Sequence, residues 1–295
     1  MSVVKVSVIM SVYNDELYVS DAVKSILNQT YEDFEFIIIN DGSTDNSFEI
    51  LNNYANEDDR IILINQDNMG LTKSLNKAIA LSKNNFIARM DSDDISLPNR
   101  LEKQVVFLKE NTEYALVGTN VIKIDTVGGV IEINKTKYKD SDIRKTFRTR
   151  NCIAHGSVML NKSLCGNILK YDETFKYAQD YRLWADVSLM YKVANLKESL
   201  YQLRIHIQSI SKNKVEEQSK YAGIVAYEYD TKSKIINYLE EIENNSLLRR
   251  KIGMILLLNM ESKLARKYFT SIHPFYYMTF LLEYIDIKKI KKWFK

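Results

Sequence analysis

The stretch FIARMDSDD, residues 86–94, decides the fold class, because a short apolar run leads there directly into a cluster of acidic residues. Earlier runs rich in β-branched or aromatic residues lie at 6–12 (VSVIMSV), 34–40 (FEFIIIN) and 61–65 (IILIN). Between the runs lie longer stretches with helical spacing, at 16–28, 47–55 and 72–81. Continuous apolar strands that alternate with helices are typical of a parallel sheet covered on both faces. The sequence therefore predicts an α/β fold.

The rest of the chain predicts a second region of different character. After the first third we expect a helix at 100–109, a strand at 115–124, a Gly128-Gly129 turn between two β-like segments, a helix at 181–190 and an extended segment at 203–211. Helical periodicity without strand runs then covers 215–239, 247–269 and 275–294. We therefore predict a main domain at 1–214 and a C-terminal helical region at 215–295.

Composition excludes several classes of protein. The 295 residues carry 41 Lys and Arg against 38 Asp and Glu, and the resulting charge of +3 is too small for a dedicated nucleic-acid binder. Two cysteines, Cys152 and Cys165, are too few for a disulfide scaffold and suit a reducing cytosol. The apolar run at 275–282 is far shorter than the roughly 20 residues of a membrane-spanning helix, and no secretory signal opens the sequence.

Polar residues follow each of the four predicted strands. They are Tyr13-Asn14, DGSTD at 41–45, Asp67-Asn68 and DSDD at 91–94. The carboxyl ends of parallel strands share one edge of the sheet, and ligands bind outside that edge. The sequence therefore predicts one site that all four strand ends build.

The acidic stretch at 91–94 is the candidate cation site. Its three carboxylates repel one another, so a fold tolerates them best beside a cation. Mg²⁺ and Mn²⁺ take oxygen ligands, and Mg²⁺ often combines one or two carboxylates with substrate phosphates. A solvated turn or helix cap is the alternative. The position after a buried strand, in series with three other polar strand ends, favours a site.

The stretch at 41–45 has two compatible interpretations. Asp41 can accept a hydrogen bond from a base such as uracil, while Gly42 with Ser43 or Thr44 is typical of a turn that caps the next helix. Neither a G-x-G-x-x-G after the first strand nor a G-x-x-x-x-G-K-[ST] occurs, which argues against dinucleotide-binding and P-loop proteins. A nucleotide diphosphate would then need a metal ion to neutralise it.

Three further residues are candidates with open alternatives. Asp180, just before a predicted helix, is either a general base or the cap of that helix. His206 alternates with apolar residues and is either a metal ligand or a half-buried strand histidine. The role of His155, in AHGS, is equally open.

Seven motifs in order then point to a family. SVYN, DGSTD, DNxG, DSDD, HGSVM, QDYxLW and RxHxxSIS, within residues 4–212, closely resemble the inverting bacterial glycosyltransferases with the A-type, nucleotide-diphospho-sugar transferase fold. The resemblance is strongest to members that build capsule, O-antigen or exopolysaccharide. It implies a Rossmann-like, mostly parallel sheet flanked by helices. It also implies Mn²⁺ or Mg²⁺ and transfer of a hexose or N-acetylhexosamine from a UDP-sugar to a glycan or lipid-linked acceptor.

The resemblance also implies roles for individual positions. Asp180 matches the catalytic base, Asp93 the metal-binding Asp of the D-x-D motif, and His206 a residue that completes the metal or pyrophosphate site. Asp41 would bind the uracil ring, and Asp91 would face ribose or sugar hydroxyls. The donor-binding positions are Ser11, Val12, Tyr13, Asp41, Asn68, Lys73, Asp91, Ser92 and His155.

Three positions depart from the family pattern. Ser11 stands where Pro is common, which matters little if the backbone makes the contact. Leu75 stands where Arg is common, so a contact to the donor phosphate or sugar is either missing or supplied by Lys73. Gln179 replaces the usual Glu before Asp180 and removes one negative charge beside the base.

The C-terminal stretch 284–295 predicts a membrane contact. It holds five lysines and one aspartate among apolar residues, as in helices that lie on an anionic leaflet, although a terminal helix packed on its neighbours is the alternative. The resemblance adds a polyprenyl-diphosphate-linked acceptor, so we expect a cytoplasmic protein on the inner face of the cell membrane. The abundant tyrosines and the apolar third helix are compatible with a homodimer.

Two other functions stay open at this point. A sugar nucleotidyltransferase shares the architecture but would show a glycine-rich basic loop after the first strand, where MSVYN stands at 10–14. A non-catalytic module that binds nucleotide or glycan would have no need of Asp93, Asp180 and His206 together.

Overall fold

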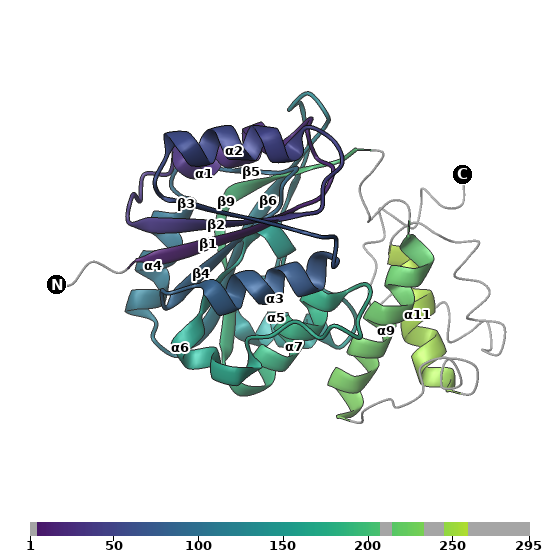
Figure 1. Cartoon of the computed structure of the whole chain (residues 1–295). Helices are drawn as coiled ribbons and strands as arrows, with labels where there is room; N and C mark the ends of the chain where they lie inside the picture. The colour runs from purple at the N-terminus through teal and green to yellow at the C-terminus, as the bar shows by residue number, and fades with distance from the viewer. Residues whose placement is uncertain (1–4, 207–213, 233–244, 259–295) are drawn as a thin grey trace. The chain divides into compact units, whose positions relative to one another are not determined.

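The computed structural model describes residues 5–206, 214–232 and 245–258. Contacts divide the chain into two compact units, Met1–Phe147 with Asn151–Ser209 and Arg148–Arg150 with Ile210–Lys295. The first unit contains the sheet and the predicted site, and the second contains helices (Figure 1).

The first unit is built on a mixed sheet with the strand order β3-β2-β1-β4-β8-β6-β9-β5, to which β7 adds at β6. The four predicted strands are present as neighbours, and the pairs β1–β2, β1–β4 and β2–β3 are parallel. Their bounds are β1 Val6–Val12, β2 Phe34–Asp41, β3 Ile61–Gln66 and β4 Phe86–Met90. The later strands are β5 Ile95–Ser96, β6 Tyr114–Ile124, β7 Val130–Asn134, β8 Met159–Asn161 and β9 Lys192–Arg204.

Helices cover both faces of this sheet, as a buried parallel sheet requires. In Figure 1, α1 and α2 lie on one face of β1–β3 and α3 lies on the other. Helix α1 buries Val19, Ala22, Val23 and Ile26, the spacing of one helical face. The helices are α1 Val19–Leu27, α2 Ser47–Glu57, α3 Leu71–Leu81, α4 Arg100–Glu110, α5 Asp140–Phe147, α6 Lys162–Cys165 and α7 Gln179–Met190.

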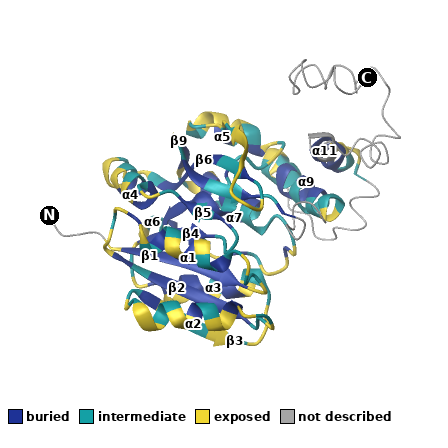
Figure 2. Ribbon diagram, turned by 90° about the horizontal axis from the view of Figure 1, so that it is seen from above, coloured by how far each residue is buried: buried dark blue, intermediate teal, exposed yellow. Residues whose placement is uncertain are grey.

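The core lies between the sheet and its helices. Every residue of β1 and β4 is buried, and Figure 2 shows the central strands as the buried part of the unit. Two strands covered on both faces need no polar alternation, which explains the continuous apolar runs in their sequences. The predicted α/β fold is confirmed.

Two elements differ from the prediction. The extended segment expected at 203–211 is the end of a longer strand, β9, that begins at Lys192, while residues 207–213 lie outside the described residues. Polar, partly exposed residues and register shifts against β6 interrupt β9 in its middle, so its sequence shows no continuous apolar run. The Gly128–Gly129 turn does join two strands, but a helix, α5, follows them and was not predicted. Only Ile143 and Phe147 of α5 are buried.

The second unit contains α9 (Val215–Thr231) and α11 (Ser246–Leu258). These two helices pack closely at Gly223, where a Cβ would lie 2.4 Å from Cγ1 of Ile252. The buried Lys251 amino group donates to Asp230 at 2.9 Å and to the Arg148 carbonyl at 2.6 Å. Among the described residues, no helix has the length and apolarity to cross a membrane. The third predicted helix and the basic stretch at 284–295 lie outside the described residues.

Two loops at the carboxyl edge of the sheet touch at a glycine. Gly42 has a φ of +75°, and a Cβ on it would lie only 2.6 Å from the backbone nitrogen of Asn68. Gly128 has a similar φ of +89° with no atom within 4 Å of its Cβ direction. Gly42 is therefore needed both for the left-handed backbone and for the close approach of Asn68, whereas Gly128 is needed for the left-handed backbone alone.

Replacing Gly42 with Ala tests this contact. The left-handed backbone costs an alanine about 1–2 kcal/mol, and the clash with Asn68 adds about 1–3 kcal/mol. We expect Gly42→Ala to lower the free energy of unfolding, measured by urea denaturation, by more than Gly128→Ala, which pays only the backbone cost. Equal losses for the two variants would contradict the tight contact between the loops.

Candidate functional site

The acidic loop at 91–94 lies at the carboxyl end of β4 and meets the end of β9. The Asp93 carboxylate lies 2.9 Å from Nε2 of His206. The backbone N–H of Arg204 donates to Asp94 at 2.7 Å, and the Arg204 Nε donates to the Asp93 carbonyl at 2.9 Å. Residues about 110 positions apart in sequence are therefore joined at one place, and the structure brings together the predicted pair Asp93 and His206.

Arginines buried beneath the loop supply countercharge to its carboxylates. Arg89, on β4, forms an ion pair with Asp91 and is 1% exposed. Arg100 is fully buried, donates to the Gly156 carbonyl at 2.7 Å and lies over the Tyr201 ring at 5.3 Å. Burial lowers the pKa of Arg100 to about 10, a value at which it still carries its charge at neutral pH.

The carboxylates respond to the same burial. Burial raises the pKa of Asp91, and the charge of Arg89 opposes that rise. Burial also raises the pKa of Asp94 well above its usual value, and the charges of Asp93 and Asp91 add to the effect. The hydrogen bond that His206 donates to the Asp93 carboxylate raises the pKa of His206. The loop is therefore crowded with negative charge, and bound positive charge would relieve it.

A tight contact fixes the orientation of Asp91. The Tyr201 hydroxyl accepts the Asp91 N–H at 3.1 Å. A Cβ on Gly156 would lie 2.5 Å from Oδ2 of Asp91 and would overlap the Tyr201 hydroxyl. The HGSVM motif therefore supplies a glycine because Asp91 and Tyr201 occupy the space that a side chain would fill.

The first two strand ends form the other side of the site. Ser11 and Val12 are buried in β1, whereas Tyr13 is 52% exposed just after it. Asn14 has a φ of +52°, and its side-chain oxygen accepts the Thr44 N–H at 2.7 Å. A hydrogen bond therefore joins the SVYN motif to the DGSTD motif.

Asp41 organises the loop after β3. Its carboxylate accepts the N–H groups of Met69 at 2.9 Å and Gly70 at 2.8 Å and the side-chain amide of Gln66 at 2.8 Å. Burial acts to raise the pKa of Asp41, but these hydrogen bonds outweigh it and the pKa is lowered. The Ser74 hydroxyl is a further hydrogen-bond partner of this carboxylate, so the roughly four acceptor positions of Asp41 are all used within the protein. The predicted turn at Gly42 is present, but the predicted helix cap is wrong: α2 begins at Ser47, after Asn46, and the Ser43 hydroxyl instead accepts the Asn14 N–H at 3.1 Å.

The residues after β3 differ in exposure. Asn68 and Lys73 are exposed, Asn68 on the loop beside Gly42 and Lys73 in the first turn of α3. Leu75 is fully buried in α3. The position where the family often has Arg is therefore part of the core here.

Asp180 lies in the first turn of α7, which begins at Gln179, directly after a left-handed residue, Ala178, with a φ of +54°. The side-chain amide of Asn151 donates to its Oδ2 at 2.8 Å, and the Asn151 oxygen accepts the Ile153 N–H at 3.0 Å. Burial and, to a smaller extent, the charge of Asp91 raise the pKa of Asp180 to about 6, while the Tyr181 N–H and the charge of Arg89 oppose the rise. Asp180 and the acidic loop are therefore close enough to share one electrostatic environment.

His155 is held in an aromatic cluster. Its Nε2 lies 2.8 Å from the Tyr171 hydroxyl, and its ring lies 5.5 Å from the Tyr171 ring and 6.1 Å from the Trp184 ring. Burial, together with the charge of Arg89, lowers the pKa of His155 well below its usual value. It is therefore a neutral side chain at physiological pH.

Sequence reasoning missed several residues of this site. Asp15 forms a hydrogen bond with Ser92 and feels the charges of Asp93 and His206, and burial raises its pKa to about 6. Asn151 and Tyr201 were also missed, because no local pattern distinguishes them. Arg89 did carry a signal: a basic residue within the apolar run FIARM has to find a buried partner.

The residues present fit a divalent cation that also binds substrate. In the part of the chain that the structure describes, no group of three His, Cys, Asp or Glu side chains forms a ready-made metal site. Asp93 and His206 supply two ligand atoms 2.9 Å apart, and neighbouring ligands about 2.1 Å from an octahedral ion lie about 3 Å apart. Substrate phosphates and water would complete such a site.

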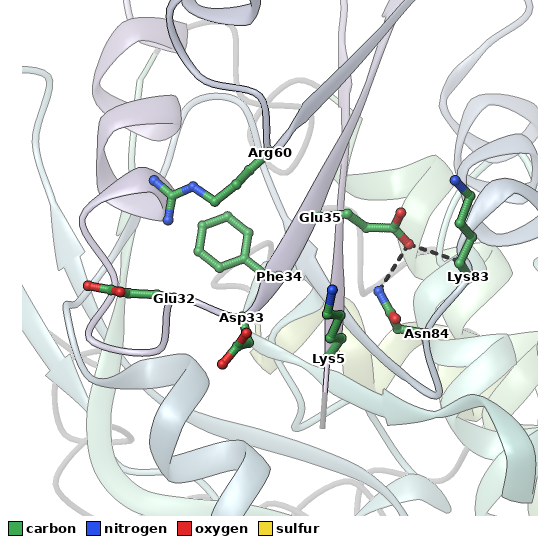
Figure 3. Close-up of a pocket in the computed structure, with 8 residues that line it drawn as sticks. All are labelled: Lys5, Glu32, Asp33, Phe34, Glu35, Arg60, Lys83 and Asn84. Atoms are coloured by element: carbon green, nitrogen blue, oxygen red, sulfur yellow. Dashed lines mark hydrogen bonds between the residues drawn. The ribbon is translucent and has the colours of Figure 1, made fainter. Parts of the chain in front are cut away.

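A hollow of about 510 Å³ lies elsewhere, at the amino ends of the strands. In Figure 3, Glu35 turns toward Lys83 and Asn84, and Arg60 covers the Phe34 ring. Glu35 accepts the Lys83 N–H at 2.9 Å and the Asn84 amide at 3.1 Å. These internal bonds tie strand ends together, at the edge of the sheet opposite to the candidate site.

Comparison with known proteins places this architecture in a family. The model of Glycosyl transferase family 2 matches residues 7–167. The O-antigen biosynthesis glycosyltransferase WbnJ of Escherichia coli is 38% identical over 215 residues, which cover 70% of this chain and 82% of that protein.

Solved structures show the same fold at low sequence identity. The structure of S. aureus TarS 1–349 in complex with UDP-GlcNAc aligns with a TM-score of 0.62 and 17% identity, over 86% of this chain and 73% of that chain. The mannosyltransferase PcManGT from Pyrobaculum calidifontis, in complex with GDP-Man and Mn²⁺, aligns with a TM-score of 0.61 and 13% identity, over 91% and 75%. The A-type glycosyltransferase fold expected from the motifs is therefore confirmed, and the chain belongs to glycosyl transferase family 2.

Proposed function

We propose that this chain is an inverting, metal-dependent glycosyltransferase that moves a hexose or N-acetylhexosamine from a UDP-sugar. The acceptor would be a glycan or a polyprenyl-diphosphate-linked sugar in surface polysaccharide synthesis. One observation carries the proposal: a carboxylate with a pKa of about 6, Asp180, shares its electrostatic environment with the D-x-D loop. A base for the acceptor and a binding site for the donor diphosphate would then face the same reacting carbon.

The donor would bind across the carboxyl ends of the strands. Ser11, Val12 and Tyr13 would line the nucleoside pocket, and Asp41 would accept the uracil N–H in place of one of its present donors. Asn68, Lys73, Ser92 and His155 are further positions assigned to the donor. Asp91, which Arg89 and Tyr201 hold in place, would accept hydrogen bonds from ribose or sugar hydroxyls.

Asp180 would act as the general base on the acceptor. As the acceptor oxygen forms its bond to the anomeric carbon, its proton passes to the Asp180 carboxylate and the nucleotide diphosphate leaves with the bonding electron pair. A single displacement of this kind inverts an α-linked donor to a β-linked product. A pKa near 6 leaves the base ionised at pH 7 while keeping it more basic than an ordinary Asp.

Asp93 and His206 would hold Mn²⁺ or Mg²⁺. When bound, such a cation stabilises the negative charge that develops on the departing diphosphate. Asp15 and Ser92, which are bonded to each other beside Asp93, would keep the loop in place.

The relatives support the finer parts of this proposal. TarS was solved with UDP-GlcNAc and PcManGT with GDP-Man and Mn²⁺, which supports a nucleotide-sugar donor and a metal ion. WbnJ is named for O-antigen biosynthesis, which supports a surface polysaccharide. We further propose that residues 1–214 carry catalysis, and that the basic stretch at 284–295 holds the protein on the inner face of the cell membrane, with a homodimer as a possible assembly.

The role of Asp180 predicts the effect of its neutral isostere. We expect Asp180→Asn to keep UDP binding, measured by calorimetry, and to lower kcat for sugar transfer by about 100-fold or more, because the proton acceptor is lost. Asp186→Asn, on the same helix, is the matched control and should transfer at nearly the normal rate. Undiminished turnover by Asp180→Asn would refute the assignment.

The amide of Asn151 predicts a change in the pH profile. A base must be ionised, so kcat/KM should fall as the pH drops through about 6. The Asn151 hydrogen bond favours the charged carboxylate, so Asn151→Ala should raise the pKa of Asp180 and move this acidic limb to higher pH. Asn111→Ala, at the end of α4, serves as the control. An acidic limb that stays in place in Asn151→Ala would show that the amide does not tune the base.

The donor site predicts a metal-dependent stabilisation. UDP with Mn²⁺ at about 100 times the dissociation constant should add about 2.7 kcal/mol to the free energy of unfolding, seen as a higher Tm. Asp93→Asn should lose this shift, whereas Asp59→Asn, at an exposed position, should keep it. A shift with another nucleotide alone would change the donor class, and no shift with any nucleotide would favour a non-catalytic module.

A further inference from the structure

The hairpin that joins β6 to β7 presents apolar side chains to solvent. Val127, Val130, Ile131 and Ile133 are 89%, 63%, 55% and 60% exposed. Lys135, Lys137 and Lys139 follow at alternate positions and are all exposed. We call these seven residues the hairpin surface. Large β-branched side chains rarely gather in the open without a binding partner.

The exposure is built into a well-ordered turn. The Asp125 carboxylate accepts the N–H groups of Val127 at 3.0 Å and Gly129 at 2.7 Å, and the Asp125 N–H donates to the Gly129 carbonyl at 2.9 Å. Lys123 and Glu132 pair across the two strands at 2.9 Å. The hydrogen bonds therefore fix the turn, while successive residues of β7 such as Val130 and Ile131 point to opposite faces of the strand, so the exposed apolar side chains surround its open edge.

The turn is also fastened to the candidate site. The Arg204 guanidinium donates to the Thr126 carbonyl at 3.1 Å and the Asp125 carbonyl at 3.4 Å, and its Nε donates to the Asp93 carbonyl at 2.9 Å. One buried arginine therefore joins the hairpin to the acidic loop. A partner that binds the hairpin surface would therefore lie near the acidic loop of the candidate site.

We propose that the hairpin surface docks on an anionic lipid membrane. Apolar side chains flanked by lysines match a bilayer with acidic headgroups, since the first enter the interface and the second meet the charge. Within the described residues no acidic side chain pairs with Lys135, Lys137 or Lys139.

Charge favours lipid over a second copy of the chain. In an antiparallel pairing of two copies at the open edge of β7, centred on Glu132, the two Glu132 carboxylates would lie opposite each other and repel. Both copies would also bring the same three lysines to the assembly. An anionic bilayer carries the opposite charge. The biological role of this membrane binding rests on the proposed function, because a site held at the membrane can reach a lipid-linked acceptor. The membrane binding itself does not depend on catalysis.

Vesicle co-sedimentation of the full chain tests the proposal. We expect binding to phosphatidylcholine vesicles that contain phosphatidylglycerol, weaker binding at high salt, and little binding to phosphatidylcholine alone. The apolar variant V127T/V130T/I131T/I133T keeps β-branched residues in the strand, and the basic variant is K135Q/K137Q/K139Q. Each should lower the partition coefficient by about ten-fold or more, since each lysine near an anionic surface is worth about five-fold.

Matched controls separate the hairpin from other surfaces. L81Q/V106Q/M190Q removes exposed apolar side chains from helices and should bind vesicles like the unmodified chain. K288Q/K289Q/K291Q/K292Q removes charge from the C-terminal stretch, and this variant should retain the part of the vesicle binding that depends on the hairpin surface. Full vesicle binding by both hairpin variants would overturn the proposal. Sedimentation velocity without lipid gives a second test: a dimer of the unmodified chain that becomes a monomer in the apolar variant would also overturn it.

A thermal-shift measurement on the same proteins distinguishes the two possible failures. Hairpin variants that keep the shift with UDP and Mn²⁺ are correctly folded, so unchanged vesicle binding then overturns the membrane inference alone. Absence of the nucleotide shift from the unmodified chain would instead overturn the proposed function.

Discussion

The site depends on arginines that are buried against the acidic loop at the end of β4, where Arg89 forms an ion pair with Asp91. Arg89 and Arg100 are no more than 1% exposed and Arg204 is 4% exposed, and each meets the acidic loop or the residues that hold it. Burying a charge without a partner is costly. The elements that bring these arginines, β4, α4 and β9, must therefore converge on one place, and that convergence creates the site.

The parts of the fold that sequence could predict are those set by local pattern. Strands β1 and β4 were predicted with the bounds they have, because they are covered on both faces and so remain apolar throughout. The acidic stretch stood out for the same reason, since its charges directly follow a buried run. The pairing of Asp93 with His206 followed from the family resemblance, as local sequence left His206 open.

The parts that sequence could not predict depend on distant contacts. Asn151 reaches Asp180 across 29 positions and Tyr201 reaches Asp91 across 110, and neither has a neighbour in sequence that reveals the partner. Strand β9 is polar in its middle, so its pairing with β6 has no periodic signature. The sequence around Asp15 is that of an ordinary loop, and only the structure shows its hydrogen bond with Ser92. The roles of these residues can be recognised only in the folded structure, because their partners lie far away in the sequence.

The same contacts explain why an uncharged residue suits position 179. Burial and Asp91 raise the pKa of Asp180, while Arg89 and the backbone N–H of Tyr181 lower it, and the balance lies at about 6. A second carboxylate directly beside Asp180 would add to the raising influences. The carboxylate proposed as the base would then be partly protonated at neutral pH, and fewer molecules would be ready to accept a proton. Gln179 adds no such charge, so the departure from the family pattern is consistent with the proposal that Asp180 is an ionised base at pH 7.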